Sequence, residues 1–292
     1  MDFEFEMMRF MFAFFCGYFI SVSGSLSQLV TNNSLASPST LGMDGAAVLF
    51  ILVSQIILVV FNIDFSLNHL SLILFAGTSL VLFPFVFYKS KVKNIWHQLN
   101  MQKVILFGLA FNLMIGALFS VIQFLFMALN FEFPVGLWFG SFKQYDQNFI
   151  FIFIIVFMVT QLVLYRLSPK IEVLNLGSSI AQGMGFDVEF IQKFGLYISF
   201  ILTGIVISYF GVFSFLGLIF PHILRSFRFF KRNMKFEILL GPYFCGAILG
   251  VVDQLCYNVT VHGAELPVGM VSSVIGAFVL ILLVFKLNLS RT

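Results

Sequence analysis

The chain has 292 residues and a formal net charge of +3, with 60% apolar residues and only 10% charged residues. Soluble folded proteins draw about 25% of their residues from Asp, Glu, Lys and Arg, so this composition excludes a soluble globular protein. It also excludes a disordered chain and a disulfide-rich scaffold. We therefore expect a membrane protein, most of whose exterior faces lipid. The cysteines (Cys16, Cys245 and Cys256) lie in or at the end of apolar runs and are predicted to be small buried side chains.

Apolar runs of membrane-spanning length follow one another along the whole chain. A spanning helix needs about 20 mainly apolar residues. Runs of this kind cover residues 10–30, 46–61, 69–88, 104–129, 149–167, 194–210, 212–224, 236–257 and 266–285. The seventh run is too short for an ordinary span. We therefore predict an all-α, polytopic bundle of about nine spans (eight to ten), with residues 1–292 forming one transmembrane domain.

The distribution of basic residues predicts the orientation of these runs. The first residues include Asp2, Glu4 and Glu6, whereas a cleavable signal peptide has a basic start. If the N-terminus lies outside and every run crosses, fourteen of the sixteen Lys and Arg residues lie on the inner side. Because cytoplasmic loops are rich in Lys and Arg, this arrangement is the expected one, with the C-terminus in the cytoplasm. The basic residues at 225–235 then form a cytoplasmic loop, and no nucleic-acid partner is predicted.

Two stretches at membrane depth contain many polar residues, Gly or Pro. They cover residues 21–45 and 211–226, where we expect irregular backbone. Such backbone is tolerated in a membrane only where protein buries it or where it lines a wet cavity, so both stretches are candidates for a substrate path. Small residues at four-residue spacing (Gly17, Ser21 and Ser25, and Gly246 with Gly250) predict close helix packing.

The sequence contains no motif of a catalytic site. The phosphate loop G-x-x-x-x-G-K-[ST], H-E-x-x-H, C-x-x-C and G-x-S-x-G are all missing. We therefore expect a transport subunit that is not an enzyme, hydrolyses no ATP itself and binds neither a cofactor nor a metal. The ionisable residues considered as functional candidates at membrane depth are few: His222 in the seventh run, Asp253 near the outer end of the eighth and Glu265 at the start of the ninth. Asp253 could be the proton site of a secondary carrier, or it could bond to polar neighbours such as Gln254 and Asn258.

Six segments, in chain order, resemble motifs of the permease subunits of iron-siderophore, haem and vitamin B12 ATP-binding-cassette (ABC) importers, the FecCD and BtuC-like permeases. The segments are residues 23–28 with 33–42 (S-G-a-x-x-Q, N-P-L-A-x-P and L-G), 138–141 (W-x-x-G-S), 174–185 (L-x-L-G-x-x-x-A-x-x-L-G), 215–225 (F-x-G-L-I-x-P-H-x-x-R), Asp253, and 265–269. The fourth of these segments, at 215–225, is the strongest. The matching residues in the later motifs are Gly217, Pro221, His222, Arg225, Asp253, Glu265, Pro267 and Gly269.

This resemblance implies a type II ABC importer permease in a bacterial inner membrane. Two permeases, identical or paired with a related chain, would form the path. Two cytoplasmic ATPase subunits would use ATP and Mg, and an external binding protein would deliver the cargo. The resemblance, together with residue polarity, suggests a path and gate at Ser23, Ser25, Gln28, Asn33 and Leu35, and an ATPase-coupling loop at 174–189 with Leu176, Gly177, Ala181 and Gly185. Asp187 in that loop is a predicted helix N-cap.

The chain also departs from the family pattern. Family members usually carry ten spans, and the resemblance leads us to expect that the chain opens at the family's second helix, through either a late start or a functional nine-span version. The family's R-x-x-R pair aligns with Glu6 and Arg9, Tyr257 stands where relatives have Arg, and Ser34 stands where they have Pro. Arg9 and Lys143 are the remaining outer cations and the candidates for docking the binding protein. We expect import of an iron-siderophore or related metal chelate. Haem, vitamin B12 and, less favoured, proton-coupled transport remain open.

Overall fold

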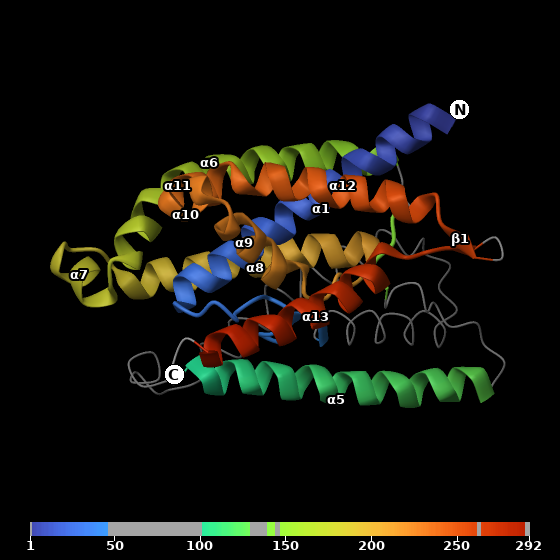
Figure 1. Ribbon diagram of the computed structural model, residues 1–292, viewed down its shortest axis with the longest axis horizontal. Coiled ribbons are helices and arrows are strands. Elements are labelled where there is room, and N and C mark those ends of the chain that lie inside the picture. The colour runs from blue at the N-terminus through green and yellow to red at the C-terminus, as the bar shows by residue number, and fades with distance from the viewer. Residues whose placement is uncertain (1, 46–100, 129–138, 144–146, 262–263, 290–292) are drawn as a thin grey trace, which may run out of the picture.

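The structure, a computed structural model, describes residues 2–45, 101–128, 139–143, 147–261 and 264–289 (Figure 1). The long helices are α1 (Asp2–Thr31), α5 (Met101–Ala128), α6 (Ile150–Asn175), α8 (Val188–Phe210), α12 (Gly241–Tyr257) and α13 (Val268–Leu289). The short ones are η2 (Gln147–Phe149), α7 (Ser178–Gly183), α9 (Leu216–Ser226), α10 (Arg228–Arg232) and α11 (Met234–Leu239). Strands β1 (Thr260–Val261) and β2 (Ala264–Glu265) pair antiparallel. The predicted helical class is confirmed, with this small hairpin added.

Within the described residues, four helices are long and apolar enough to cross a membrane. They are residues 4–31 of α1, 108–125 of α5, α6 and α8. Only 17% of the spanning part of α5 and 28% of that of α6 is buried, as expected for helices that face lipid or a partner subunit. The predicted runs at 46–61 and 69–88 lie outside the described residues, so the count of nine spans stays a prediction.

Helix α1 is the centre of the bundle and packs against α12, α8 and α9 (Figure 1). A Cβ atom built on Gly17 would lie 2.8 Å from the Cβ of Leu249, and one built on Gly246 would lie 2.6 Å from the carbonyl oxygen of Phe14. Both distances are shorter than real Cβ contacts, so only Gly allows α1 and α12 to approach this closely. The predicted small-residue packing is confirmed here. The three cysteines are free and buried, also as predicted.

The irregular stretches are shorter than the sequence suggested. Residues 21–31 continue α1, and irregular backbone begins at Asn32, whose φ is 49°. The prediction was wrong for these residues: the hydroxyl groups of Ser23 and Ser27 bond across to α8, and the helix backbone stays intact. At 211–226, Gly211 (φ 83°) and Phe215 (φ 65°) bracket an irregular segment, but α9 is regular from Leu216 onward.

One predicted span is divided. The run at 236–257 forms α11 and α12, separated at Leu240, with Pro242 in the first turn of α12. Proline favours the first turn of a helix and disrupts a helix interior, so the chain restarts there. A Cβ on Gly241 would lie 2.5 Å from Cδ1 of Leu224, which shows how tightly the junction packs on α9.

Two opposite ends of the molecule carry distinctive elements. Helix α7 lies at one end of the long axis, and the β1–β2 hairpin lies at the other (Figure 1). Helix α1 begins on the hairpin side, and α13 runs from the hairpin side toward the side of α7 (Figure 1). The sequence motifs are therefore distributed between two ends that are separated by the length of the helices.

Candidate translocation site

A cluster of hydroxyl groups joins α1 to α8. The hydroxyl of Ser23 lies 2.8 Å from that of Ser199 and 2.6 Å from that of Thr203, and Ser27 lies 2.6 Å from Ser199. Ser199 in turn donates to the carbonyl oxygen of Ser23 at 2.8 Å. Ser23 and Ser25 are both fully buried. In this structure these residues are packed between helices, so their predicted place on the cargo path stays a prediction.

The turn after α1 contacts the strongest motif of the sequence. Asn33 accepts a hydrogen bond from the backbone N–H of Leu35 at 2.9 Å, which closes a tight turn. The Nε2 atom of His222, on α9, lies 3.0 Å from the carbonyl oxygen of Ser34 in the same turn. The predicted gate residues Asn33 and Leu35 are thus held at the end of α9, although their gating role is a prediction.

Arg225 connects three helices at the same end of the molecule. Its Nη1 atom donates to Oε1 of Gln28 at 2.8 Å, and its Nε atom donates to Oε1 of Glu237 at 2.9 Å. The amide group of Gln28 also donates to the carbonyl oxygen of Leu218 at 3.4 Å. Gln28 therefore serves as a link between α1 and α9, and the buried carboxylate of Glu237 in α11 has a charged partner.

Glycines of separate motifs meet in pairs. A Cβ on Gly24 would lie 1.8 Å from the carbonyl oxygen of Gly217, so α1 and α9 are in direct backbone contact. Gly269 donates its N–H to the carbonyl oxygen of Gly140 at 2.8 Å, and a Cβ on Gly269 would lie 2.3 Å from the nitrogen of Gly140. Pro267 precedes α13 and accepts from the N–H of Met270 at 3.0 Å. Pro221, inside α9, is buried.

The predicted coupling loop forms the α7 end of the molecule. Gly177 (φ 124°) and Gly185 (φ 83°) adopt backbone conformations that side chains disfavour, and they flank α7. Asp187 accepts from the N–H of Phe190 at 3.0 Å and caps α8, as predicted. Ala181 is fully buried and anchors α7, whereas Leu176, Ile180 and Met184 are each more than half exposed. This end therefore presents apolar side chains on a well-defined short helix.

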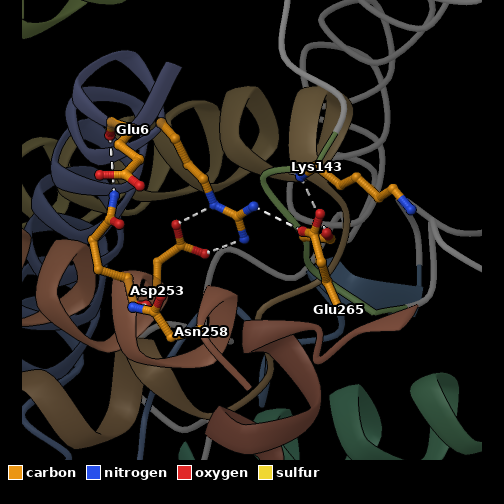
Figure 2. A network of polar contacts seen from close by, with 8 residues as sticks. Glu6, Lys143, Asp253, Asn258 and Glu265 are labelled. Carbon is orange, nitrogen blue, oxygen red and sulfur yellow. Dashed lines mark hydrogen bonds and ion pairs between the residues drawn. The ribbon is translucent and has the colours of Figure 1, made fainter. Parts of the chain in front are cut away.

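The hairpin end contains a buried ion cluster (Figure 2). Arg9 donates to both carboxylate oxygens of Asp253, at 2.6 and 3.0 Å, and to Oε2 of Glu265 at 2.8 Å. The side chains of Arg9 and Asp253 are 1% and 0% exposed. The guanidinium of Arg9 also lies 4.7 Å from the ring centre of Tyr257. Tyr257 therefore covers the guanidinium of Arg9.

The ion cluster bears on the two predicted docking residues, Arg9 and Lys143. Arg9 was a docking candidate because of its position in the sequence, but the structure buries it against two carboxylates, so it offers no charge to a partner's surface. Lys143 is exposed, and its backbone N–H donates to the hydroxyl of Ser141 at 3.2 Å (Figure 2). Lys143 remains available for docking. Asp253 bonds to Arg9, while its neighbours Gln254 and Asn258 donate to the carbonyl oxygens of Glu6 and Gln254.

Comparison with known proteins decides the family. Residues 1–286 match the FecCD transport family. The chain belongs to this family. It is similar to the petrobactin import system permease YclO of Bacillus subtilis, with 28% identity over 80% of this chain and 73% of the relative. It is also similar to the hemin transport system permease HmuU of Yersinia pestis, with 28% identity over 92% of this chain and 78% of the relative.

A solved structure supports the FecCD fold. It is that of an inward-facing ABC transporter described as of metal-chelate type, with a TM-score of 0.75 at 21% identity, and the match covers 96% of this chain and 85% of that one. At this identity the likeness shows the fold. The FecCD motifs recognised in the sequence lie at the contacts described above: α1 with α9, residues 139–143 with the start of α13, and Arg9 with Asp253.

Sequence reasoning missed several residues of these contacts. Ser199 and Thr203 of α8 and Glu237 of α11 belong to no quoted motif, yet they complete the hydroxyl cluster and the Arg225 cluster. A carboxylate in an apolar run is a detectable signal for Glu237, because such residues are costly in a membrane unless paired. The two α8 hydroxyls carry no such signal.

Substitution of Arg225 should lower the stability of the folded chain by a measurable amount. We expect Arg225→Gln to cost about 2–3 kcal/mol, because it leaves the buried carboxylate of Glu237 without its charged donor. Arg225→Lys should cost less, since an ammonium keeps the charge but cannot bridge Glu237 and Gln28 as a planar guanidinium does. Unfolding in mixed detergent micelles measures both variants. A Gln variant as stable as the wild type would contradict this account.

Proposed function

We propose that this FecCD chain is the permease subunit of an ABC importer that carries an iron-siderophore or a related metal chelate into the cytoplasm. The observation that carries the proposal is the family match over residues 1–286. Relatives that match between 80% and 98% of this chain are permeases for hydroxamate, dicitrate, petrobactin, hemin and vitamin B12 systems. Iron chelates are the commonest cargo in these names, which favours them over haem and vitamin B12.

The α7 end is the proposed contact with an ATPase subunit. Exposed apolar side chains on and beside a short, anchored helix suit insertion into a groove of a partner protein; Ile180 on α7 and the flanking Leu176 and Met184 supply them. The chain carries no phosphate loop, so ATP hydrolysis is assigned to that partner. A second permease and an external binding protein complete the proposed importer, with Lys143 as the docking cation on the outer side.

Proton-coupled transport through Asp253 is disfavoured. A proton site needs a carboxylate that can gain and lose its proton during transport, whereas both oxygens of Asp253 accept from the guanidinium of Arg9. A nearby positive charge stabilises the ionised carboxylate. Uptake that survives removal of the ATPase but stops when the proton gradient is dissipated would nevertheless support this alternative.

The test of the proposal is uptake by vesicles that contain the permease, its ATPase and its binding protein. We expect Gly185→Trp to abolish ATP-driven uptake of an iron chelate while the chain remains in the membrane, because the side chain blocks the α7 end and strains a residue with φ of 83°. Leu255→Trp, on an exposed apolar face of α12, is the matched control and should transport normally. Unchanged uptake by Gly185→Trp would refute the proposed coupling.

A further inference from the structure

A cavity of about 480 Å³, lined mostly by apolar atoms, opens beside α5. It lies between the segment after α1, the middle of α5 and the irregular segment before α9. Its polar lining includes Thr40, Asp44, Asn112, Ser120 and Ser214. The α5 residues belong to the part of the helix that is long and apolar enough to cross a membrane, so the cavity lies at membrane depth. Its volume falls within the range of small-molecule sites, roughly 300–1,000 Å³.

The wall that carries Asp44 is held firmly on α5. Asn112 accepts from the N–H of Gly45 at 2.8 Å and donates to the carbonyl oxygen of Ser39 at 2.6 Å. A Cβ on Gly108 would lie 2.4 Å from the carbonyl oxygen of Thr40, so the segment rests directly on the helix backbone. Both hydrogen-bonding groups of Asn112 are thus used for attachment. Asp44 sits one residue before Gly45, at a fixed place in the wall.

Asp44 is the one charged side chain among the described residues that line this cavity. The hydroxyls of Ser39 and Ser214 hydrogen-bond to its carboxylate, and neither hydroxyl carries a charge that would cancel that of an ionised Asp44. Carboxylates at membrane depth are costly and commonly mark the path of a substrate or ion. In a partly polar interior, one charge acts on another across about 10 Å with an energy that changes binding several-fold or more.

We propose that the cargo passes through this cavity and that Asp44 favours metal chelates of neutral or positive net charge over polyanionic ones. The inference rests on the proposed function, because it names the class of chelate that the same importer carries. A cationic complex is attracted to the carboxylate. A complex with several negative charges is repelled by it and finds no compensating cation among the described lining residues.

The electrostatic part is tested without knowledge of the cargo. Ala117 lines the cavity about 8 Å along the α5 axis from Asn112. In the assembled transporter, Ala117→Cys is treated with a cationic (trimethylammonium) and an anionic (sulfonate) methanethiosulfonate. We expect Asp44→Asn to lower the cation-to-anion ratio of modification rates about tenfold. Asn233→Cys, exposed between α10 and α11, is the control and should show no change. An unchanged ratio at Ala117→Cys, or a thiol that neither reagent reaches, would overturn the proposal.

The cargo part is tested by uptake of two iron(III) trihydroxamates that differ in one charge. One carries a terminal ammonium (net +1), and the other is its acetylated form (net 0). We expect Asp44→Asn to lower the uptake ratio of the first to the second, while Glu172→Gln, half-exposed on α6, leaves it unchanged. Equal ratios in wild type and Asp44→Asn would overturn charge selection. If the intact importer transports no chelate, the proposed function fails instead, and the thiol experiment still reports on the cavity.

Discussion

Asp253→Ala is expected to lose about 3–5 kcal/mol of stability, the usual cost of removing one partner from a buried ion pair. Arg9 would keep its charge in a site where its side chain is 1% exposed, with Glu265 as the remaining carboxylate partner of this cluster. Removing the carboxylate should also loosen the packing of α1 on α12, because the ion pair between Arg9 of α1 and Asp253 of α12 joins the two helices. Detergent-induced unfolding of the purified chain measures the effect.

Two further variants separate charge from packing in this cluster. Glu265→Ala should cost less than Asp253→Ala, because Glu265 is 21% exposed and water can replace part of its contact. The double variant Arg9→Met with Asp253→Leu should recover most of the loss, since apolar side chains of similar volume often replace a buried ion pair at little cost. A double variant as unstable as Asp253→Ala would contradict the assignment of the loss to an unpaired charge.

The ion cluster also shows where sequence reasoning stops. Asp253 and Glu265 were identified because carboxylates in apolar runs are unusual, and Arg9 was identified as an outer cation. Their association could not be inferred, because Arg9 and Asp253 are separated by 244 positions. Bonding of Asp253 to its neighbours was weighed instead and is not what the structure shows. A lone charged residue reveals that it needs a partner, but local sequence does not identify which one.

Local signals predicted the α7 end much better. Glycines at 177 and 185 and the N-cap at Asp187 act within three or four residues, so the sequence alone indicated short helices there. Reliance on local signals also explains why irregular backbone was predicted wrongly at the serines of α1. Serine is common in turns and irregular segments, and nothing near Ser23 in the sequence indicates that Ser199 and Thr203 will accept and donate across the helix contact. The helical continuation of α1 to Thr31 depends on those distant partners.

The second large effect on stability is expected at the contact between α1 and α9. Two glycines of the recognised motifs meet there, and substitution by alanine should affect them differently. We expect Gly24→Ala to cost about 3 kcal/mol or more, at or above the usual cost of overpacking, because its methyl group would lie 1.8 Å from the carbonyl oxygen of Gly217. Gly217→Ala should be mild, since its nearest contact would be 3.5 Å, from Cδ of Pro38. The same contact thus contains a matched control.

Loss of this contact should also stop transport. Helix α9 carries His222 and Arg225, which hold the turn after α1 and the end of α1 itself. If Gly24→Ala pushes the helices apart, both links lengthen, so uptake should fall together with stability, whereas Gly217→Ala should retain both. Unfolding in mixed micelles and vesicle uptake measure the pair. Equal tolerance of the two substitutions would mean that α1 and α9 can separate without consequence, and that the strongest motif of the sequence serves something other than this contact.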